Sequence, residues 1–396
     1  MNPVRDLQFY NGMKLIYIAN SRIPTEKANG FQIMKMCEAF SNAGVKMELW
    51  IPKRFNQIKE SPFSYYDIRE NFGIKKIPVV DLVPLDKLLG SAAGLVESVS
   101  FAFFCLFYLP KQSEDCFIYS RDQFICWFLS FSKRKFVYEI HSFPQNTGWY
   151  KRIWKRAYRI IAITQGLKNL LVRKNIKGDK ILTAPDGVDL EAFNAVSQSK
   201  EELKIELGLP REDFLIGYVG KFKTLGMEKG IKTMIESLSL LEKDAKMVFV
   251  GGEESEMGEY KILASRFNVA AQCVFIAYQP YARMIKYIKA MDALVIPFPN
   301  EPHYAFYASP LKLFEYMASG QPIIASDLPA LKEILNDKNA LFFKPEDKND
   351  LARAVKMLKA SQTLGYHLSR QAFADVKNYT WQQRANNILK FININN

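Results

Sequence analysis

Short apolar segments alternate with helical stretches along most of the chain, and this alternation constrains its fold more than any other feature. In the first half, apolar runs of strand length occur at residues 15–19, 45–51, 116–119, 136–140, 160–164 and 181–184. Most of the segments between them have helical spacing; residues 30–43, for example, place Ile33, Met36 and Phe40 on one stripe. Strands interleaved with helices predict a parallel sheet with helices on both faces, so we expect an α/β protein.

A polar stretch at residues 194–213 interrupts the alternation and marks the expected domain boundary. A second series of apolar runs follows at residues 215–219, 247–250, 274–276, 293–296 and 322–325. At about 100–200 residues per domain, a chain of 396 residues suits two domains. We expect a Rossmann-like domain over residues 1–195, with a C-terminal helix at about 377–396 packing back on it, and a second Rossmann-like domain over residues 205–376. Two such domains would face a central cleft, with ligands at the carboxyl ends of the strands.

The positive charge of the chain is concentrated in its first half. The net charge is +13; residues 1–200 carry 29 basic and 18 acidic side chains, and the remainder carries 25 and 23. Residues 149–159 set five cations among Trp149, Tyr150, Trp154 and Tyr158. Such a charge distribution attracts nucleic acid or an anionic membrane surface, and the absence of a nucleic-acid-binding motif favours the membrane. A solvated helix with inward-facing aromatics is the alternative interpretation of this segment.

Cysteine and histidine usage argues against a disulfide framework and a metal site. The five cysteines form no C-x-x-C pair, which is typical of reduced thiols in the cytoplasm. The three histidines are not at metal-ligand spacing and no Asp-x-Asp occurs, so no metal is expected. The N-terminal residues lack the apolar core of a signal peptide. The apolar segment 88–110 contains Glu97 near its middle, which favours a buried or interfacial helix over a membrane span.

The segment 309–320, SPLKLFEYMASG, has the features of a phosphate-binding helix start. Ser309 is a good N-cap and Pro310 suits the first helical position. Lys312 lies in the first turn, where a cation opposes the helix dipole unless an anion is bound. Glu315 is placed to accept hydrogen bonds from ribose hydroxyls. An ordinary exposed helix start is the alternative interpretation.

A loop rich in glycine and lysine, residues 217–230, joins a predicted strand to a helix predicted at 231–241. Glycines let the backbone approach an anion closely, and Lys221, Lys223 and Lys229 would neutralise it. The loop is neither a G-x-G-x-x-G nor a Walker A motif, which weakens dinucleotide and P-loop interpretations. A solvated basic loop is the alternative, but two phosphate-binding segments in one half of the chain suit a nucleoside diphosphate.

Polar residues of the first half also follow predicted strands. His141 and Arg121 each come just after a strand. We interpret His141 as a candidate catalytic residue and Arg121 as a candidate contact for an anionic substrate; a structural histidine and a structural ion pair are the competing interpretations. Asn29 and Gly30 open a predicted helix, where the backbone would approach a ligand, and a plain turn is the alternative.

Together these motifs resemble glycosyltransferase family 4. The resemblance rests on Gly30, Ile163-Thr-Gln-Gly-Leu-Lys168, Pro185-Asp-Gly-Val-Asp189, the loop from Gly220 to Gly230, and Lys312-Leu-Phe-Glu-Tyr-Met-Ala-Ser-Gly-Gln-Pro322. It covers nearly the whole chain and implies the GT-B fold, with a nucleotide-sugar donor on the C-terminal domain and an acceptor on the N-terminal domain. It also implies transfer with retention at the anomeric carbon and no metal requirement.

The resemblance assigns roles to particular residues. Lys229 matches the family's diphosphate-binding lysine, Glu315 its ribose-binding glutamate, and His141 its histidine near the transferred sugar. Two positions depart from the pattern: Tyr307 stands where the family has a sugar-binding glutamate, and Lys221 stands where it has arginine, which keeps the charge but loses bidentate geometry. The predicted catalytic residues are His141, Lys229 and Lys221. The predicted donor-binding residues are Gly30, Gly220, Lys223, Ser309, Pro310, Leu311, Lys312 and Glu315, and the predicted acceptor-side residues are Asn29 and Arg121.

These assignments predict a retaining glycosyltransferase that uses a UDP- or GDP-linked sugar and no cofactor. Its acceptor would be a glycan or lipid-linked glycan in bacterial-type surface polysaccharide or glycoconjugate synthesis. We expect a cytoplasmic protein attached peripherally to the inner face of an anionic membrane through its N-terminal domain. Because Tyr307 replaces the expected glutamate, a non-catalytic sugar-nucleotide or glycan-binding partner stays an alternative, as does a sugar-nucleotide epimerase on the same fold.

Overall fold

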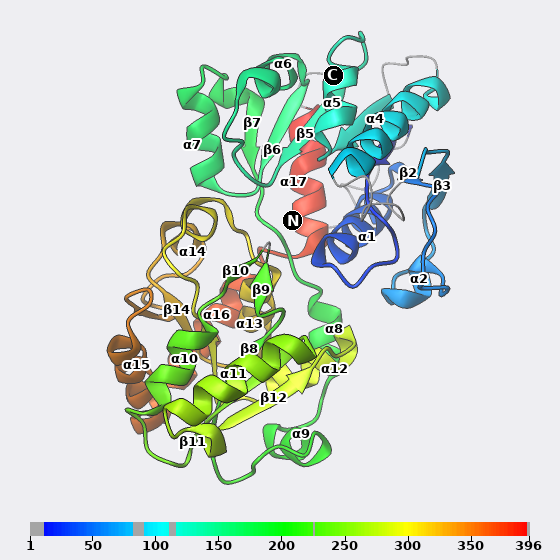
Figure 1. The fold of residues 1–396 in the computed structure, drawn as a ribbon. Helices are drawn as coiled ribbons and strands as arrows, with labels where there is room; N and C mark the ends of the chain where they lie inside the picture. The colour runs from blue at the N-terminus through cyan, green and yellow to red at the C-terminus, as the bar shows by residue number, and fades with distance from the viewer. Residues whose placement is uncertain (1–11, 82–90, 111–115, 225, 394–396) are drawn as a thin grey trace. The chain divides into compact units, whose positions relative to one another are not determined.

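The computed structural model describes residues 12–81, 91–110, 116–224 and 226–393. The chain divides into two compact units (Figure 1). The first unit comprises residues 1–185 and 381–396, and the second comprises residues 186–380. Each unit has its own parallel sheet and its own helices, in agreement with the predicted α/β class.

The first unit is built on a parallel sheet whose described strands follow the order β3-β2-β1-β4-β5-β6-β7. The strands are β1 (Lys14–Ile18), β2 (Lys46–Pro52), β3 (Gly73–Ile77), β4 (Cys116–Ser120), β5 (Phe136–Ile140), β6 (Arg159–Ala162) and β7 (Ile181–Thr183). Its helices are α1 (Ala28–Asn42), α2 (Pro62–Tyr65), α4 (Ser91–Tyr108), α5 (Gln123–Leu129), α6 (Gly148–Arg156), α7 (Gln165–Arg173), the short η3 (Gly178–Lys180) and α17 (Trp381–Asn393). The strand order reverses between β1 and β4, which places the expected ligand-binding edge after those two strands.

The second unit repeats this plan with a sheet of described order β12-β11-β8-β13-β14-β15. The strands are β8 (Phe214–Val219), β11 (Ala245–Gly252), β12 (Cys273–Ala277), β13 (Ala293–Ile296), β14 (Ile323–Ser326) and β15 (Leu341–Phe343), with a small antiparallel ribbon of β9 (Lys223–Thr224) and β10 (Met227–Glu228). Its helices are α8 (Leu190–Ala195), α9 (Lys200–Glu206), α10 (Ile231–Leu238), α11 (Glu254–Arg266), η4 (Ala270–Gln272), α12 (Tyr281–Lys289), the π-helical η5 (His303–Tyr307), α13 (Leu311–Ser319), α14 (Pro329–Lys332), α15 (Lys348–Ala360) and α16 (Gln362–Val376). Here the order reverses between β8 and β13, so both units have the Rossmann-like arrangement.

Two strands of these sheets have no counterpart among the predicted strands, and both lie at sheet edges. β3 carries Lys75 and Lys76, whose side chains are exposed, so its sequence lacks an apolar run. β15 is only three residues long. Edge strands need less apolar surface than central ones, which is why hydrophobic patterning missed them.

The division between the units falls at Pro185 and Asp186, ahead of the polar stretch that the sequence pattern marks. Phe193 of α8 and Leu203 of α9 are buried in the same core as β8 and α12, so both short helices belong to the second unit. An isolated β-bridge between Val188 and Thr380 joins the two ends of that unit. The polar composition of the boundary segment therefore reflects surface helices rather than a linker.

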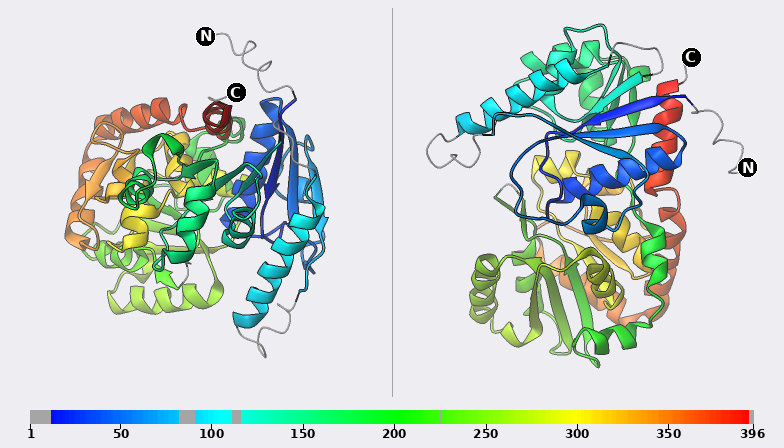
Figure 2. Two further views of the ribbon diagram at one scale, coloured as in Figure 1. Left: turned by 90° about the horizontal axis from the view of Figure 1, so that it is seen from above. Right: turned by 90° about the vertical axis from the view of Figure 1, so that its right-hand side faces the viewer.

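The C-terminal helix α17 is part of the first unit and packs beside α1 (Figure 2). Arg384 of α17 is buried; its Nη2 lies 2.8 Å from Oε2 of Glu139, and its Nε donates to the carbonyl of Pro185 at 2.9 Å. Glu139 is also buried and sits within β5. One arginine thus ties the end of the chain both to the central sheet and to the last residue before the second unit.

We predict that Arg384→Met lowers the free energy of unfolding of the first unit by about 3–5 kcal/mol, because it leaves the Glu139 carboxylate buried without its partner. Urea unfolding, followed by a probe in that unit, measures the loss. Lys14→Met is the matched control. It breaks an ion pair with Glu48 at 2.7 Å whose side chains are each more than a quarter exposed, and it should cost less than about 1 kcal/mol. Equal losses for the two variants would contradict the prediction.

Candidate functional site

In the second unit, two glycines bring separate loops together where the strand order reverses. Gly230 precedes α10 with φ of +88°, and a Cβ at this position would lie 1.7 Å from the carbonyl oxygen of Pro297, just after β13. Gly220 follows β8 with φ of +128°, and its Cβ would lie 3.1 Å from Nζ of Lys312. Side chains at these positions would push the loops apart, so the glycines permit the close approach. The loops after β8 and β13 therefore share one edge of the sheet with α13.

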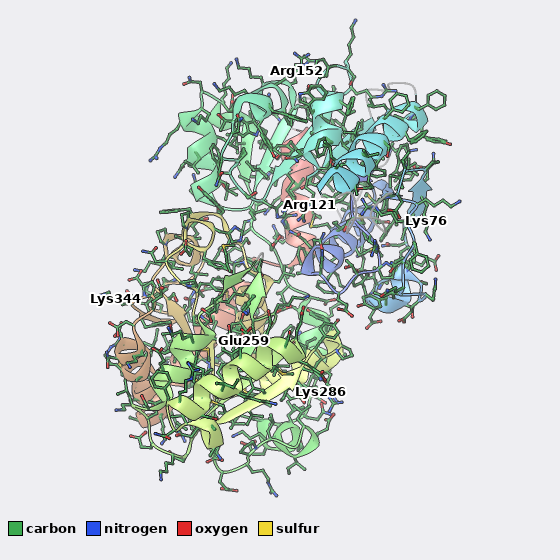
Figure 3. All side chains as sticks on the ribbon, viewed as in Figure 1. Lys76, Arg121, Arg152, Glu259, Lys286 and Lys344 are labelled. Carbon is green, nitrogen blue, oxygen red and sulfur yellow. The ribbon has the colours of Figure 1, made fainter. Side chains whose placement is uncertain are left out.

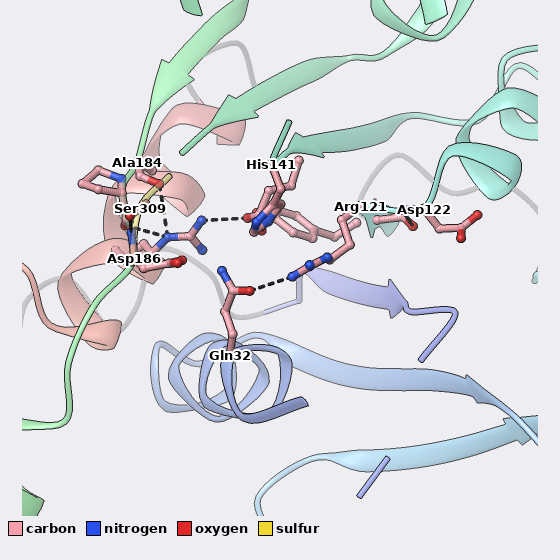
Figure 4. Close-up of polar contacts among 12 residues, drawn as sticks. Gln32, Arg121, Asp122, His141, Ala184, Asp186 and Ser309 are labelled. Atoms are coloured by element: carbon pink, nitrogen blue, oxygen red, sulfur yellow. Dashed lines mark hydrogen bonds and ion pairs between the residues drawn. The ribbon is translucent and has the colours of Figure 1, made fainter. Parts of the chain in front are cut away.

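The start of α13 lies one residue later than predicted, so the prediction that Pro310 is its first helical residue is wrong. The N-cap is Pro310, whose backbone is extended, and helical residues begin at Leu311. Ser309 was predicted as the N-cap, and this is wrong: its Oγ instead accepts a hydrogen bond from the backbone N–H of Asp186 at 2.9 Å (Figure 4). The physical reason is that Pro310 has an extended ψ of 129°, which puts the first helical residue at Leu311, so Ser309 lies one residue outside the capping position and its hydroxyl anchors residue 186 instead.

Lys312 is buried in the first turn of α13, so the alternative of an ordinary exposed helix start is wrong. Its side chain is 8% exposed, and its Nζ has no hydrogen-bond partner among the described residues. The ammonium group lies 3.4 Å from the centre of the Tyr218 ring and 5.9 Å from that of Phe298. Aromatic faces attract a cation but do not replace its lost hydrogen bonds. Burial, and next the charge of Lys229, place the pKa of Lys312 well below its ordinary value.

Lys229 and Lys221 lie close enough to share this electrostatic environment. Burial, and next the charge of Lys221, lower the pKa of Lys229 to about 8. Lys221 is itself more exposed, with its Nζ 3.7 Å from Oε1 of Glu253. Lys229 therefore repels both Lys221 and Lys312, and a bound anion would stabilise this group of lysines. Lys223 pairs with Glu259 at 2.8 Å on the β9–β10 ribbon, and its predicted contact with the donor stays a prediction.

Carboxylates of the same unit have distinct surroundings. Glu315 is buried one turn along α13 from Lys312, and burial raises its pKa to about 7 although Lys312 opposes the shift. Glu228 accepts hydrogen bonds from the backbone N–H groups of Gly230 at 2.7 Å and Lys232 at 3.1 Å. The protein's own glutamate therefore occupies the start of α10.

The turn that contains Tyr307 is π-helical and lies near the lysines. This turn, η5, runs from His303 to Tyr307. Burial, and next the charge of Lys229, lower the pKa of His303. The Tyr304 hydroxyl is buried without a hydrogen-bond partner among the described residues, and its ring stacks on Phe298 at 4.6 Å. Single π-helical turns are frequent at functional sites, and the sequence reasoning did not single out His303 or Tyr304.

In the first unit, His141 is held by the buried carboxylate of Glu139. Nε2 of His141 lies 2.5 Å from Oε1 of Glu139. Despite burial, Arg384 and His141 hold the pKa of Glu139 well below its ordinary value, so the carboxylate only accepts. Burial, and next the charge of Arg121, lower the pKa of His141 to about 4, although Glu139 opposes the shift. At neutral pH the single imidazole proton therefore sits on Nε2, and Nδ1 is left as an acceptor.

The other predicted residues of the first unit have partners of their own. Nη1 of Arg121 donates to Oε1 of Gln32 at 2.6 Å (Figure 4). Arg121 comes directly after β4, and Gln32 lies in α1, which follows β1; the strand order reverses between these two strands. Nδ2 of Asn29 donates to Oγ of Ser21 at 3.1 Å. The predicted helix start at Gly30 is wrong, because α1 begins at Ala28. The backbone N–H of Gly30 already donates to the carbonyl of Lys27 at 3.0 Å, so the first turn forms before the predicted start.

Gly30 is required by a neighbouring side chain rather than by a turn. A Cβ at this position would lie 2.1 Å from the hydroxyl of Tyr66, which donates to the carbonyl of Thr25 at 2.8 Å. The structure thus supplies a packing reason for this glycine. Its predicted contact with the donor stays a prediction.

Glu139 and Arg384 are the main residues that sequence reasoning missed. One signal was present: Glu139 is a charged residue inside an apolar strand, two positions before His141. A buried charge requires a partner. The identity of that partner was not available from the sequence, because Arg384 is 245 positions away.

Residues 199–375 match the family model described as "Glycosyl transferases group 1". Among curated relatives, the putative teichuronic acid biosynthesis glycosyltransferase TuaC of Bacillus subtilis is 25% identical over 226 residues, covering 57% of this chain and 54% of the relative. N,N'-diacetylbacillosaminyl-diphospho-undecaprenol alpha-1,3-N-acetylgalactosaminyltransferase of Campylobacter jejuni is 22% identical over 235 residues, covering 58% of each chain. The chain spans about half the length of the curated relatives it matches. These matches support a glycosyltransferase domain of group 1 type.

Solved structures resemble the chain over nearly its full length. Anabaena HepE in complex with UDP has a TM-score of 0.71 at 15% identity, covering 96% of this chain and 99% of that one. Sucrose-phosphate synthase from Thermosynechococcus elongatus has a TM-score of 0.73 at 18% identity, covering 96% and 98%. Together with the two parallel-sheet units, these likenesses identify the GT-B fold, and the predicted fold class is confirmed.

Proposed function

We propose that this protein is a retaining, metal-independent glycosyltransferase of family 4 that transfers a sugar from a UDP- or GDP-linked donor. The second unit would bind the donor and the first unit the acceptor. The acceptor would be a glycan or a lipid-linked glycan, and the relatives named for teichuronic acid biosynthesis and for a diphospho-undecaprenol acceptor support this class.

The observation that carries this proposal is the buried, unpaired ammonium group of Lys312. A charge removed from water is costly unless an opposite charge or hydrogen bonds compensate it. Among the described residues Nζ of Lys312 has no hydrogen-bond partner, and the centre of the Tyr218 ring lies 3.4 Å away. The charge of Lys229 adds repulsion that the charge of Glu315 opposes. A diphosphate would supply both the negative charge and the hydrogen-bond acceptors. Glu315, one turn along α13 from Lys312, would accept a hydrogen bond from a ribose hydroxyl.

The same lysines would serve the chemical step. As the bond from the anomeric carbon to the β-phosphate oxygen breaks, negative charge develops on the leaving diphosphate, and Lys221, Lys229 and Lys312 would stabilise it. In this mechanism, the acceptor oxygen attacks on the face that the phosphate leaves, and the departing phosphate oxygen takes the acceptor proton. The lysines take the part that a metal ion plays elsewhere.

The first unit would contribute the acceptor contacts and one polar contact to the sugar. Nδ1 of His141, an acceptor at neutral pH, is proposed to accept a hydrogen bond from a sugar hydroxyl. Arg121 and Asn29 are proposed as acceptor-side residues; the Gln32 partner of Arg121 occupies one of its donor groups.

The proposal includes peripheral attachment of the first unit to an anionic membrane. Lys151, Arg152, Lys155 and Arg156 of α6 are exposed, whereas Trp154 is fully buried. Four of the five cations in residues 149–159 therefore face solvent, and only part of the aromatic surface of this segment does. Basic residues near anionic lipid contribute about 1 kcal/mol each.

A turnover assay tests the proposed activity. The protein is incubated with a panel of UDP- and GDP-sugars and with glycan and lipid-linked acceptors, and released nucleoside diphosphate and transferred sugar are measured. We expect acceptor-dependent release with one donor, unchanged by EDTA, and a product whose anomeric configuration by NMR matches that of the donor. Binding without turnover would indicate a non-catalytic sugar-nucleotide-binding protein, and donor isomerisation without acceptor would indicate an epimerase.

Lys312→Met is predicted to weaken binding of UDP or GDP by roughly ten- to a hundredfold, because it removes a charge-assisted hydrogen bond to the diphosphate. The same change should raise the thermal stability of the ligand-free protein, since it removes an uncompensated buried charge. Calorimetric titration and thermal unfolding measure the two effects. Lys286→Met, at a lysine of the same unit that pairs with Glu206 at 2.6 Å, is the matched control and should leave nucleotide binding unchanged and thermal stability nearly so. Destabilisation by Lys312→Met without loss of binding would refute the role.

Nucleotide binding is predicted to weaken by about tenfold or more from pH 7 to pH 9. The pKa of Lys229 in the free protein is about 8, so raising the pH through this window removes a proton that the bound diphosphate needs on the lysine. A bound anion would raise this pKa. At pH 9 Lys229 must therefore take up a proton when the nucleotide binds, and this requirement weakens binding. Lys229→Arg should flatten the dependence, because arginine stays charged. Equal affinity of the wild-type protein at both pH values would contradict this assignment.

A further inference from the structure

An exposed apolar face runs along α4 in the first unit. Its members are Leu95, Val96, Val99, Phe103 and Phe107, which we call the α4 face. Phe107 is 81% exposed and Phe103 is 59% exposed. The spacing of these residues brings them to one side of the helix over about 18 Å, from the rise of 1.5 Å per residue. A contiguous apolar surface of this kind on a folded protein marks an interaction site.

The side of α4 that faces the protein carries one charged residue, and the ion pair of this residue holds the helix in place. Glu97 is the one charged residue in α4, is 2% exposed, and forms an ion pair with Arg54. Arg54 also donates to Oδ1 of Asn20 at 2.5 Å, and Asn20 donates to Oγ of Ser98 at 3.0 Å. The charge of the helix therefore faces the protein, and the α4 face has none. No helix among the described residues has the length and apolar character that a membrane span requires.

Further aromatic side chains lie on α5, on α6 and at Phe131, just after α5. α5 packs against both α4 and α6. Trp127 lies 4.7 Å from Phe131 and 5.1 Å from Trp149 between ring centres, and Phe131 and Trp149 are 57% and 43% exposed. Tryptophan and phenylalanine at a surface suit the boundary between headgroups and acyl chains.

Cations accompany these apolar groups. Nζ of Lys75 lies 5.0 Å from the ring centre of Tyr108 at the end of α4, and Nη2 of Arg134 donates to the carbonyl of Pro110 at 2.8 Å. The guanidinium of Arg152 lies 3.8 Å from the ring centre of Phe131. Figure 3 labels Arg152 and Lys76 on this unit. Two copies of such a basic surface would repel one another, whereas anionic lipid would attract it.

We propose that the α4 face inserts into the interface of an anionic lipid bilayer, with the helix lying in the plane of the membrane. This deepens the membrane attachment in the proposed function and rests on it. The apolar side chains enter the boundary between headgroups and acyl chains, the flanking cations contact lipid phosphates, and the Arg54–Glu97 pair keeps the helix on the protein surface. Attachment is then hydrophobic as well as electrostatic.

Co-sedimentation with phosphatidylcholine vesicles, with and without phosphatidylglycerol, tests this proposal. The wild-type protein should bind the anionic vesicles and retain part of that binding at high salt. The double variant Phe103→Asp with Phe107→Asp should bind at least about a hundredfold more weakly, because two apolar side chains no longer enter the membrane. The matched control is Ile262→Asp with Tyr366→Asp in the second unit, two side chains that are each 59% exposed; it should bind as the wild type does.

Each other outcome overturns the proposal. Wild-type-like binding by the Phe103/Phe107 variant, or binding that high salt abolishes completely, would show that charge alone attaches the protein. Absence of vesicle binding, with a wild-type dimer that the variant dissociates in light scattering, would assign the α4 face to self-association. UDP binding is measured for both variants and should be unchanged. Absence of both UDP and GDP binding in the wild-type protein would refute the proposed function without bearing on the vesicle result.

Discussion

A carboxylate buried in the central sheet organises the first unit. Glu139 sits in β5, pairs with Arg384 of α17, and also contacts His141 and the Tyr119 hydroxyl. The ion pair keeps the C-terminal helix on the unit, and Arg384 extends the connection to the carbonyl of Pro185. The same carboxylate sets the protonated nitrogen of His141. Structural stability and the state of a candidate catalytic group thus depend on one charge, which cannot change without affecting both.

The second unit also contains a buried charged side chain, but this one lacks the polar partners that Glu139 has. Lys312 is buried without a hydrogen bond among the described residues and beside the charge of Lys229. The free protein therefore carries an electrostatic cost that a bound anion would remove, and in the proposed mechanism this would stabilise the negative charge that develops on the leaving group. Gly220 and Gly230 make this arrangement possible by letting loops and lysine approach where side chains would collide.

Much of the α/β architecture was predictable, because alternating apolar runs and helical stretches directly reflect burial on both faces of a parallel sheet. The edge strands β3 and β15 were not, since exposed lysines or short length remove that pattern. The site was predictable in part. Lys229, Lys312 and Glu315 stand in recognisable motifs and lie in one unit near each other, but the hydrogen bond of Ser309 to Asp186 replaces the predicted cap. The Tyr66 contact also explains Gly30 without a ligand.

The sequence by itself determined two α/β domains, the placement of candidate residues after strands, and the concentration of positive charge in the first half. These features follow from local periodicity and composition, which do not depend on contacts between residues far apart in the chain. Only the tertiary structure decided that Arg384 is the partner of Glu139, that Lys312 is unpaired, and that α4 buries Glu97 while exposing Phe103 and Phe107. Burial and pairing are set by contacts between residues far apart in the chain. The free energy of a buried charge depends on this burial and on its partners.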